Sequence, residues 1–107
     1  MPTADELYDR ANELKFQGKL AEAVAALQQA TEIDPNHSQT HSALAILHQR
    51  LGDTEKAIHH AKRVIELKPT DQFSYTQLSV IFQRCGRLDE AEAVMFKARE
   101  MTARPNS

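Results

Sequence analysis

Residues 85–91 read CGRLDEA, and two earlier stretches, LGDTEKA at residues 51–57 and QGKLAEA at residues 17–23, are near-copies of it. Glycine and alanine hold the same places in all three copies, and consecutive copies start 34 residues apart. Pro35 and Pro69 have the same spacing. A fixed period of this length indicates stacked supersecondary units, because a single unit cannot bury its apolar face without a neighbour.

Each repeating unit contains two stretches with the apolar spacing of a helix. In the first unit, Leu7, Ala11 and Leu14 share one helical face, and Leu20 and Leu27 share one in the second stretch. Residues at these spacings lie on the same side of an α-helix. The pattern therefore predicts a helical hairpin in every unit and no strand anywhere in the chain.

Glycine and proline mark the ends of the predicted helices. The glycine of each copy can adopt the left-handed conformation that a helix C-terminus requires. Pro35 and Pro69 prevent the second helix of a unit from continuing. Asn36, and either Thr70 or Asp71, are candidate caps for the helices that follow. The predicted helices span residues 3–17, 20–33, 37–50, 54–67, 71–84 and 88–102.

The pattern resembles that of the tetratricopeptide repeat (TPR) family over residues 4 to about 105. That family repeats a helix–turn–helix with W-x2-L-G-x2-Y, then A-x3-F, then proline. Arg10, His41 and His48 stand where the family usually has apolar residues. The first part of the motif is matched in the last unit by Tyr75, Leu78, Ser79 and Phe82.

The resemblance implies an all-α fold, an α-solenoid of three hairpins with six antiparallel helices. Only a few residues follow the third repeat, so we expect no separate capping helix. It implies a single domain over residues 1–107. The expected repeats are residues 4–37, 38–71 and 72–105.

The last predicted helix differs from its two counterparts on one face. Glu92 takes the place of Val24 and Ile58, and Arg99 is charged where the earlier copies are not. A stack must present a polar outer face at its end, so we expect this helix to close it. Phe96 lies on the same face. It is either a single exposed aromatic residue or a contact with a partner or another copy of the chain.

By resemblance to the family, the first helix of each repeat lines a concave binding groove. The residues expected there are Asp5, Tyr8, Asp9, Asn12, Phe16, Gln39, Ala43, Ile46, Gln49, Arg50, Phe73, Gln77, Val80, Gln83 and Arg84. Apolar members of this set could accept apolar side chains, and the amides could bond a peptide backbone. The leading hypothesis is a non-catalytic adaptor that binds a peptide or protein segment. The alternatives are a self-association module using the end face around Phe96, and plain solvated helix surface.

One specialisation of the family can be examined by position. TPR domains of chaperone co-factors hold a C-terminal carboxylate with lysine, asparagine and arginine side chains. The matching positions here hold Tyr8, Asn12, Ala43, Phe73 and Gln77, and only Asn12 fits. Without the cations a carboxylate would lose its charge-assisted hydrogen bonds, so we expect no carboxylate clamp.

All five histidines, from His37 to His60, fall within 24 residues. His37 and His41 have the spacing that lets two imidazoles share a metal ion. No cysteine or carboxylate set completes such a site, and packing between helices is the favoured interpretation, with no metal or cofactor predicted. Because burial opposes protonation of imidazole, we expect the second repeat to loosen below about pH 6.

Charge and composition limit the classes of function and partner to be expected. The net charge of −2 argues against a basic nucleic-acid or anionic-membrane surface. Cys85 is the single cysteine, and no base is positioned beside it to activate a nucleophile. No phosphate loop or metalloprotease motif is present, so no enzyme is predicted. No apolar signal or spanning segment is evident, and the expectation is a cytoplasmic protein with a protein or peptide partner of unidentified sequence.

Overall fold

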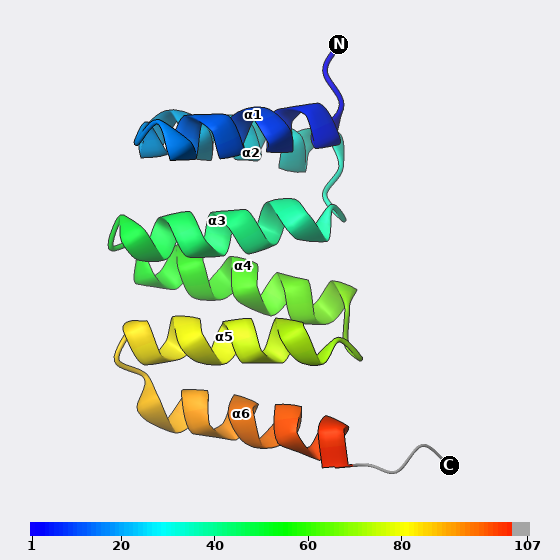
Figure 1. Cartoon of the computed structure of the whole chain (residues 1–107), viewed down its shortest axis with the longest axis vertical. Helices are drawn as coiled ribbons and strands as arrows, with labels where there is room; N and C mark the ends of the chain where they lie inside the picture. The colour runs from blue at the N-terminus through cyan, green and yellow to red at the C-terminus, as the bar shows by residue number, and fades with distance from the viewer. Residues whose placement is uncertain (104–107) are drawn as a thin grey trace.

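The computed structural model describes the backbone of residues 1–103 and the side chains of residues 1–101. This part of the chain contains helices and no strand (Figure 1). The elements are α1 (Ala4–Phe16), α2 (Leu20–Ile33), α3 (Ser38–Arg50), α4 (Thr54–Leu67), α5 (Gln72–Arg84) and α6 (Leu88–Ala103). Each lies within a few residues of its predicted range, so the all-α repeat fold is confirmed. The repeat boundaries stay predictions, and the last one, at residue 105, lies outside the described residues.

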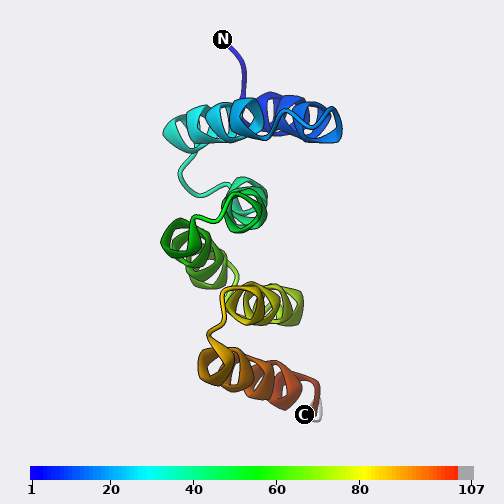
Figure 2. The same cartoon turned by 90° about the vertical axis from the view of Figure 1, so that its left-hand side faces the viewer.

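The helices form three hairpins stacked along one axis. The helices of each pair, α1 with α2, α3 with α4 and α5 with α6, pack against each other, and α2 with α3 and α4 with α5 join successive hairpins. Figure 2 shows α3 and α5 on one side of the stack and α4 and α6 on the other. The molecule measures 45 × 32 × 20 Å. The first helices of the repeats, α1, α3 and α5, therefore form one surface of an elongated stack.

The repeated glycines end the first helices as predicted. Gly52 has a φ of +85°, a conformation that a residue with a Cβ adopts only with strain. The chain reverses there, and the amide of Asp53 donates to the carbonyl of His48 at 2.8 Å. The turns at Gly18 and Gly86 contain the same six-to-one hydrogen bond, also at 2.8 Å. The alanine that follows each turn is buried, at Ala23, Ala57 and Ala91, so the paired helices can approach closely.

The helix caps agree with the sequence at one candidate and differ at the other. Asp71 caps α5 by accepting from the amide of Phe73 at 3.2 Å. Asn36 was expected to cap α3, but His37 does so by accepting from the amide of Thr40 at 3.3 Å. The helix begins one residue later than that prediction requires. Asn36 accepts instead from Arg63 at 2.9 Å.

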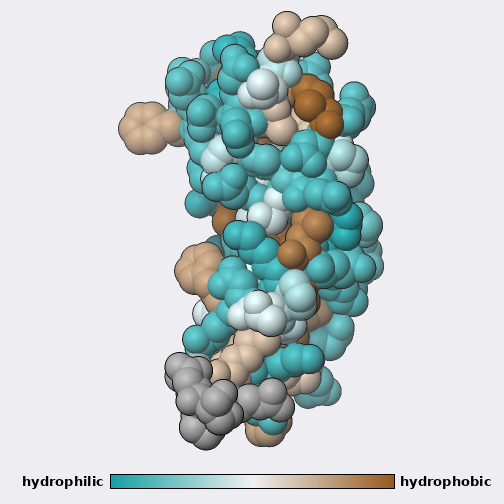
Figure 3. All heavy atoms as spheres, turned by 90° about the vertical axis from the view of Figure 1, so that its right-hand side faces the viewer, coloured by the Kyte–Doolittle hydropathy of each residue, from teal (hydrophilic) through white to brown (hydrophobic). Residues whose placement is uncertain are grey.

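The core lies between the two layers of helices. One buried cluster joins the first hairpin to α3 through Leu27, Leu44 and Leu47, each 1% exposed or less. A second joins α3 and α4 to the last hairpin and includes Ile81 and Phe82. The side of the stack that faces the viewer in Figure 3 is mostly hydrophilic, with small separated apolar areas. The apolar side chains are thus used mainly between helices.

The outer face of α6 is polar, as the sequence predicts. Glu92, Phe96 and Arg99 are all exposed, and Phe96 retains 59% of its surface. No further helix follows α6 within the described residues. None of the described helices is long and apolar enough to cross a membrane.

Candidate functional site

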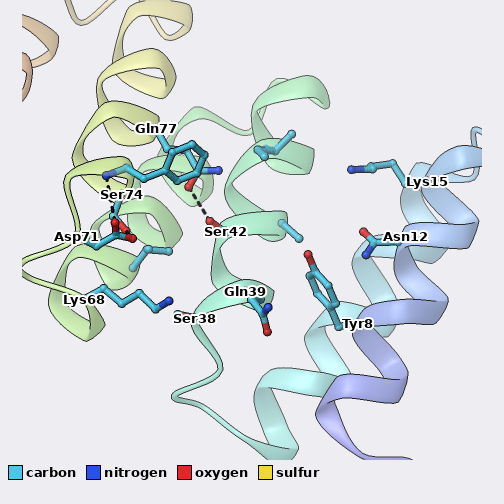
Figure 4. Close-up of a pocket in the computed structure, with 14 residues that line it drawn as sticks. Tyr8, Asn12, Lys15, Ser38, Gln39, Ser42, Lys68, Asp71, Ser74 and Gln77 are labelled. Carbon is cyan, nitrogen blue, oxygen red and sulfur yellow. Dashed lines mark hydrogen bonds between the residues drawn. The ribbon is translucent and has the colours of Figure 1, made fainter.

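Two adjoining hollows open on the surface formed by α1, α3 and α5. The first has a volume of about 390 Å³ and lies between α1, α3 and the start of α5 (Figure 4). The second has a volume of about 360 Å³ and lies between α3 and α5. Ile46, Phe73 and Gln77 line both. The two hollows therefore form one continuous depression, called the groove below.

The first hollow is lined largely by polar side chains. Tyr8 and Asn12 reach into it from α1, opposite Gln39 on α3 (Figure 4). Across its floor, Ser42 donates to the side-chain oxygen of Gln77 at 2.6 Å, which ties α3 to α5. With that oxygen occupied, the amide nitrogen of Gln77 is the part of the side chain that can donate to a ligand.

The second hollow is apolar and is bordered by arginines. Phe73 and Val80 are 73% and 38% exposed, although both are large apolar side chains. Arg50 and Arg84 stand at its edge, and Nη1 of Arg84 lies 3.4 Å from the side-chain oxygen of Gln49. This hollow can accept an apolar side chain and place a charged neighbour beside an arginine.

Most of the predicted site residues line the groove. They are Tyr8, Asn12, Ile46, Gln49, Arg50, Phe73, Gln77, Val80 and Arg84, together with the expected Gln39 and Ala43. Their role in binding stays a prediction.

Four of the expected residues lie elsewhere. Asp9 and Phe16 are exposed beyond the hollow, and Phe16 ends α1 with 93% of its surface in solvent. Gln83 is exposed on α5, which has no further first helix beside it in the described residues. Asp5 is held by His37, whose Nε2 donates to its carboxylate at 2.6 Å.

Sequence reasoning missed several residues that line the groove. Lys68 and Val64 come from the end of α4, the second helix of its repeat, whereas only first helices were expected to line the groove. Lys15 could have been found, because it stands 34 residues before Gln49, which was included. The remaining ones are Ser38, Ser42, Asp71, Ser74, Thr76 and Ile81.

His41, His48 and His60 pack between α3 and α4, which agrees with the packing interpretation made for His41 and His48, whereas His59 is exposed. His41 donates from Nε2 to the carbonyl of Pro35 at 2.7 Å. Its Nδ1 therefore accepts, and Nδ1 of His60 donates to it at 3.0 Å. The ring of His48 stacks on that of His60, with centroids 5.7 Å apart and planes 7° apart.

Burial of this cluster opposes its protonation. Burial, together with the smaller effect of the neighbouring His41, His59 and His48, lowers the pKa of His60 to about 4. Burial also lowers the pKa of His48, although Asp53 acts in the opposite direction. Among the described residues, no group of three or more histidine, cysteine or carboxylate side chains is placed to hold a metal ion.

Comparison with known proteins identifies the repeat. A family profile described as "Tetratricopeptide repeat" matches residues 17–79. The protein STIP1 homolog of Dictyostelium discoideum is 33% identical over 90 residues, which cover 78% of this chain and 16% of that protein. The Hsp70-Hsp90 organizing protein of Triticum aestivum is 30% identical over 78 residues, covering 73% and 13%. The chain thus spans only a small part of the length of these curated relatives.

Solved structures show the same fold. The crystal structure of MamA superposes with a TM-score of 0.84 at 23% identity, over 94% of this chain and 58% of that one. The second TPR of Spaghetti (RPAP3), bound to HSP90 peptide SRMEEVD, has a TM-score of 0.81 at 17% identity, over 92% of both chains. Because the family profile matches more than half of its residues, the chain belongs to the tetratricopeptide repeat family.

Proposed function

We propose that this protein is a non-catalytic adaptor that binds a peptide or protein segment in the groove. The observation that carries the proposal is the second hollow, where Phe73 and Val80 remain exposed beside hydrogen-bonding amides. Exposed large apolar side chains in a depression gain free energy when a partner covers them. Amides such as Gln77 can bond the backbone of an extended segment.

The relatives support binding of this kind. Two of them are named as a STIP1 homolog and an Hsp70-Hsp90 organizing protein, and the RPAP3 domain is described as bound to an HSP90 peptide. One relative is named a protein O-mannosyl-transferase, but this chain matches only 9% of its length. These matches fit an interaction module better than a catalytic domain.

We further propose that the groove is not a carboxylate clamp. Of the matching positions, Ala43 and Phe73 carry no charge, and Gln77 already accepts from Ser42. Lys15 and Lys68 do enter the first hollow, but from other positions in the repeat. A free C-terminal carboxylate is therefore not expected to be required for binding.

The test is a capture experiment with three forms of the protein. The groove variant is Phe73→Ala/Val80→Ala, and the control is Phe96→Ala, which removes the same aromatic ring from α6. All three substitutions favour helix, so folding should persist, and circular dichroism checks this. A partner captured by the wild type and the control, and at least about tenfold less by the groove variant, is expected. A partner captured equally by the groove variant and the wild type would place the contact outside the groove.

Self-association is the second candidate, because α6 carries Leu88 and Phe96 at 65% and 59% exposure. These residues are eight apart and so face the same side of the helix. Light scattering over a wide concentration range tests this candidate. A mass that rises with concentration, and no longer does so in Phe96→Ala, would establish it, whereas a constant monomer mass would reject it.

A further inference from the structure

The groove differs in charge from the rest of the molecule. Lys15, Lys68, Arg50 and Arg84 line it, and Asp71 is the single carboxylate among its lining residues. The whole chain carries a net charge of −2. Positive charge is therefore gathered on this surface of an otherwise acidic protein.

The carboxylate that lines the groove is already engaged within the fold. Asp71 accepts from the amide of Phe73 at 3.2 Å and from the hydroxyl of Ser74 at 2.9 Å. It caps α5, so it does not pair with the cations beside it. The groove keeps its positive character despite this residue.

None of the four cations forms an ion pair within the described part of the chain. Two arginines outside the groove do: Arg87 bonds Glu55 and also lies 3.7 Å from Glu90, and Arg63 lies 3.6 Å from Glu66. The groove cations thus keep their charge available to a ligand.

The position of three of these cations follows the groove and not a general rule for helix ends. Lys15, Arg50 and Arg84 lie in the last turns of α1, α3 and α5, the helices that line it. A cation there also offsets the helix dipole. The last turns of α2, α4 and α6 hold no basic residue, however, and Lys68, the C-cap residue that follows α4, itself lines the groove. The dipole alone would favour cations at the ends of all six helices.

We propose that the segment recognised in the groove is acidic and carries an apolar anchor, an inference that rests on the proposed function. The anchor enters the second hollow against Phe73 and Val80. Aspartate or glutamate side chains of the same segment bond Arg50 and Arg84, whose guanidinium groups can each bind a carboxylate through two hydrogen bonds. Lys15 and Lys68 receive further acidic residues in the first hollow. Because side-chain carboxylates supply the charge, the segment can be internal to its protein.

The test is a selection from a library of random nine-residue peptides, fused through their C-terminal ends to a phage coat protein so that no peptide carboxylate is free. The baits are the wild type, Arg50→Gln/Arg84→Gln, and Arg10→Gln/Arg99→Gln. The last is a matched control, because Arg10 and Arg99 are exposed outside the groove and the charge change is identical. A fourth bait, Phe73→Ala/Val80→Ala, reports on the groove itself.

Peptides that place aspartate or glutamate next to one apolar residue are expected from the wild type and the control. Their affinity should fall by about tenfold or more on Arg50→Gln/Arg84→Gln, and should fall with rising salt. Peptides without acidic residues that need Phe73 and Val80 would overturn this inference and leave the proposed function standing. Recovery of no peptide that depends on Phe73 and Val80 would overturn both.

Discussion

The second and third hairpins share one geometry and differ in chemistry. In the second, the imidazole of His41 donates to the carbonyl of Pro35 at 2.7 Å. In the third, the phenol of Tyr75 donates to the carbonyl of Pro69 at 2.9 Å. Both the donors and the acceptors are 34 residues apart. The repeat therefore preserves the hydrogen bond that fastens each first helix to the turn before it, while the side chain that makes the bond changes.

The same substitution pattern continues into the hairpin cores. His48 and His60 of the second hairpin stand where the third has Phe82 and Val94. At these positions the second hairpin holds imidazoles, which can gain a proton as the pH falls, whereas the third holds apolar side chains, which cannot. Equivalent positions in a repeat protein can have equal packing and unequal sensitivity to pH.

The largest effect is expected from removing the equivalent core leucines. Leu44 is fully buried in the cluster that joins the first hairpin to α3. Its counterpart Leu78 is 5% exposed and packs in the cluster that joins α3 and α4 to the last hairpin. We expect Leu44→Ala to lower the free energy of unfolding by about 3–4 kcal/mol and Leu78→Ala by about 2–3 kcal/mol, because each leaves a cavity. Urea unfolding followed by circular dichroism measures both. An equal or larger loss for Leu78→Ala would show that the difference in burial between these two leucines does not set the cost of removing them.

The next effect is a loss of stability on acidification. The pKa of His60 is about 4 in the fold, against about 6.5 in an unfolded chain. The unfolded state then binds more protons between these values, so stability is complete above pH 6.5 and falls as the pH drops towards 4. His60 is only partly buried, so solvent screening reduces this loss, and the lowered pKa of His48 acts in the same direction.

Melting temperatures between pH 8 and pH 5 measure this loss in the wild type and two variants. His60→Val gives the second hairpin the residue of the third and should flatten the pH dependence. His59→Gln is the comparison variant, because His59 is exposed on the same helix and burial, not the charge of His59, is the largest cause of the lowered pKa of His60. Most of the wild-type dependence should remain. A wild-type melting temperature that stays constant from pH 8 to pH 5.5 would contradict the expected difference in pH sensitivity between the two hairpins.

The sequence predictions were most accurate for features that depend on a single residue. Gly52 ends its helix because of its own backbone freedom, so register alone located the turn. Asn36 and His37 are neighbours, and which of them caps α3 is decided by where the helix begins, a one-residue difference beyond what sequence patterns resolve. Local rules therefore predicted the helices and missed one cap.

The candidate site was predicted less completely because it is built between helices. Ile46 and Phe73 were expected there, since they lie on the faces of α3 and α5 that line the groove. Lys68 enters from the end of α4, and its position follows from how the second and third hairpins stack. Periodicity within one helix contains no information on the angle at which two hairpins pack against each other. The cationic character of the groove was consequently recognised only at Arg50 and Arg84.

A smaller effect is expected at Tyr75, the counterpart of His41 in the third hairpin. Tyr75→Phe removes the hydrogen bond to the carbonyl of Pro69 and keeps the ring. It should lower the free energy of unfolding by about 1 kcal/mol, equally at pH 8 and pH 5.5. Urea unfolding at the two pH values measures this. A loss that grows at the lower pH would contradict the view that the third hairpin contains no titrating core group.

The smallest effect, and the only gain, is expected at His48. Its Nδ1 is buried without a hydrogen-bond partner in the described part of the chain, and Asp53 at 3.5 Å is farther than a typical hydrogen bond. His48→Phe supplies the residue that the third hairpin uses at this position and removes the unsatisfied nitrogen. The free energy of unfolding should rise by roughly 0.5–1 kcal/mol at pH 7 and by more at pH 5.5, because the variant has no imidazole to protonate here. A destabilised variant would mean that the contact with Asp53 outweighs the burial of the imidazole, and that the two hairpins are less interchangeable than their shared backbone indicates.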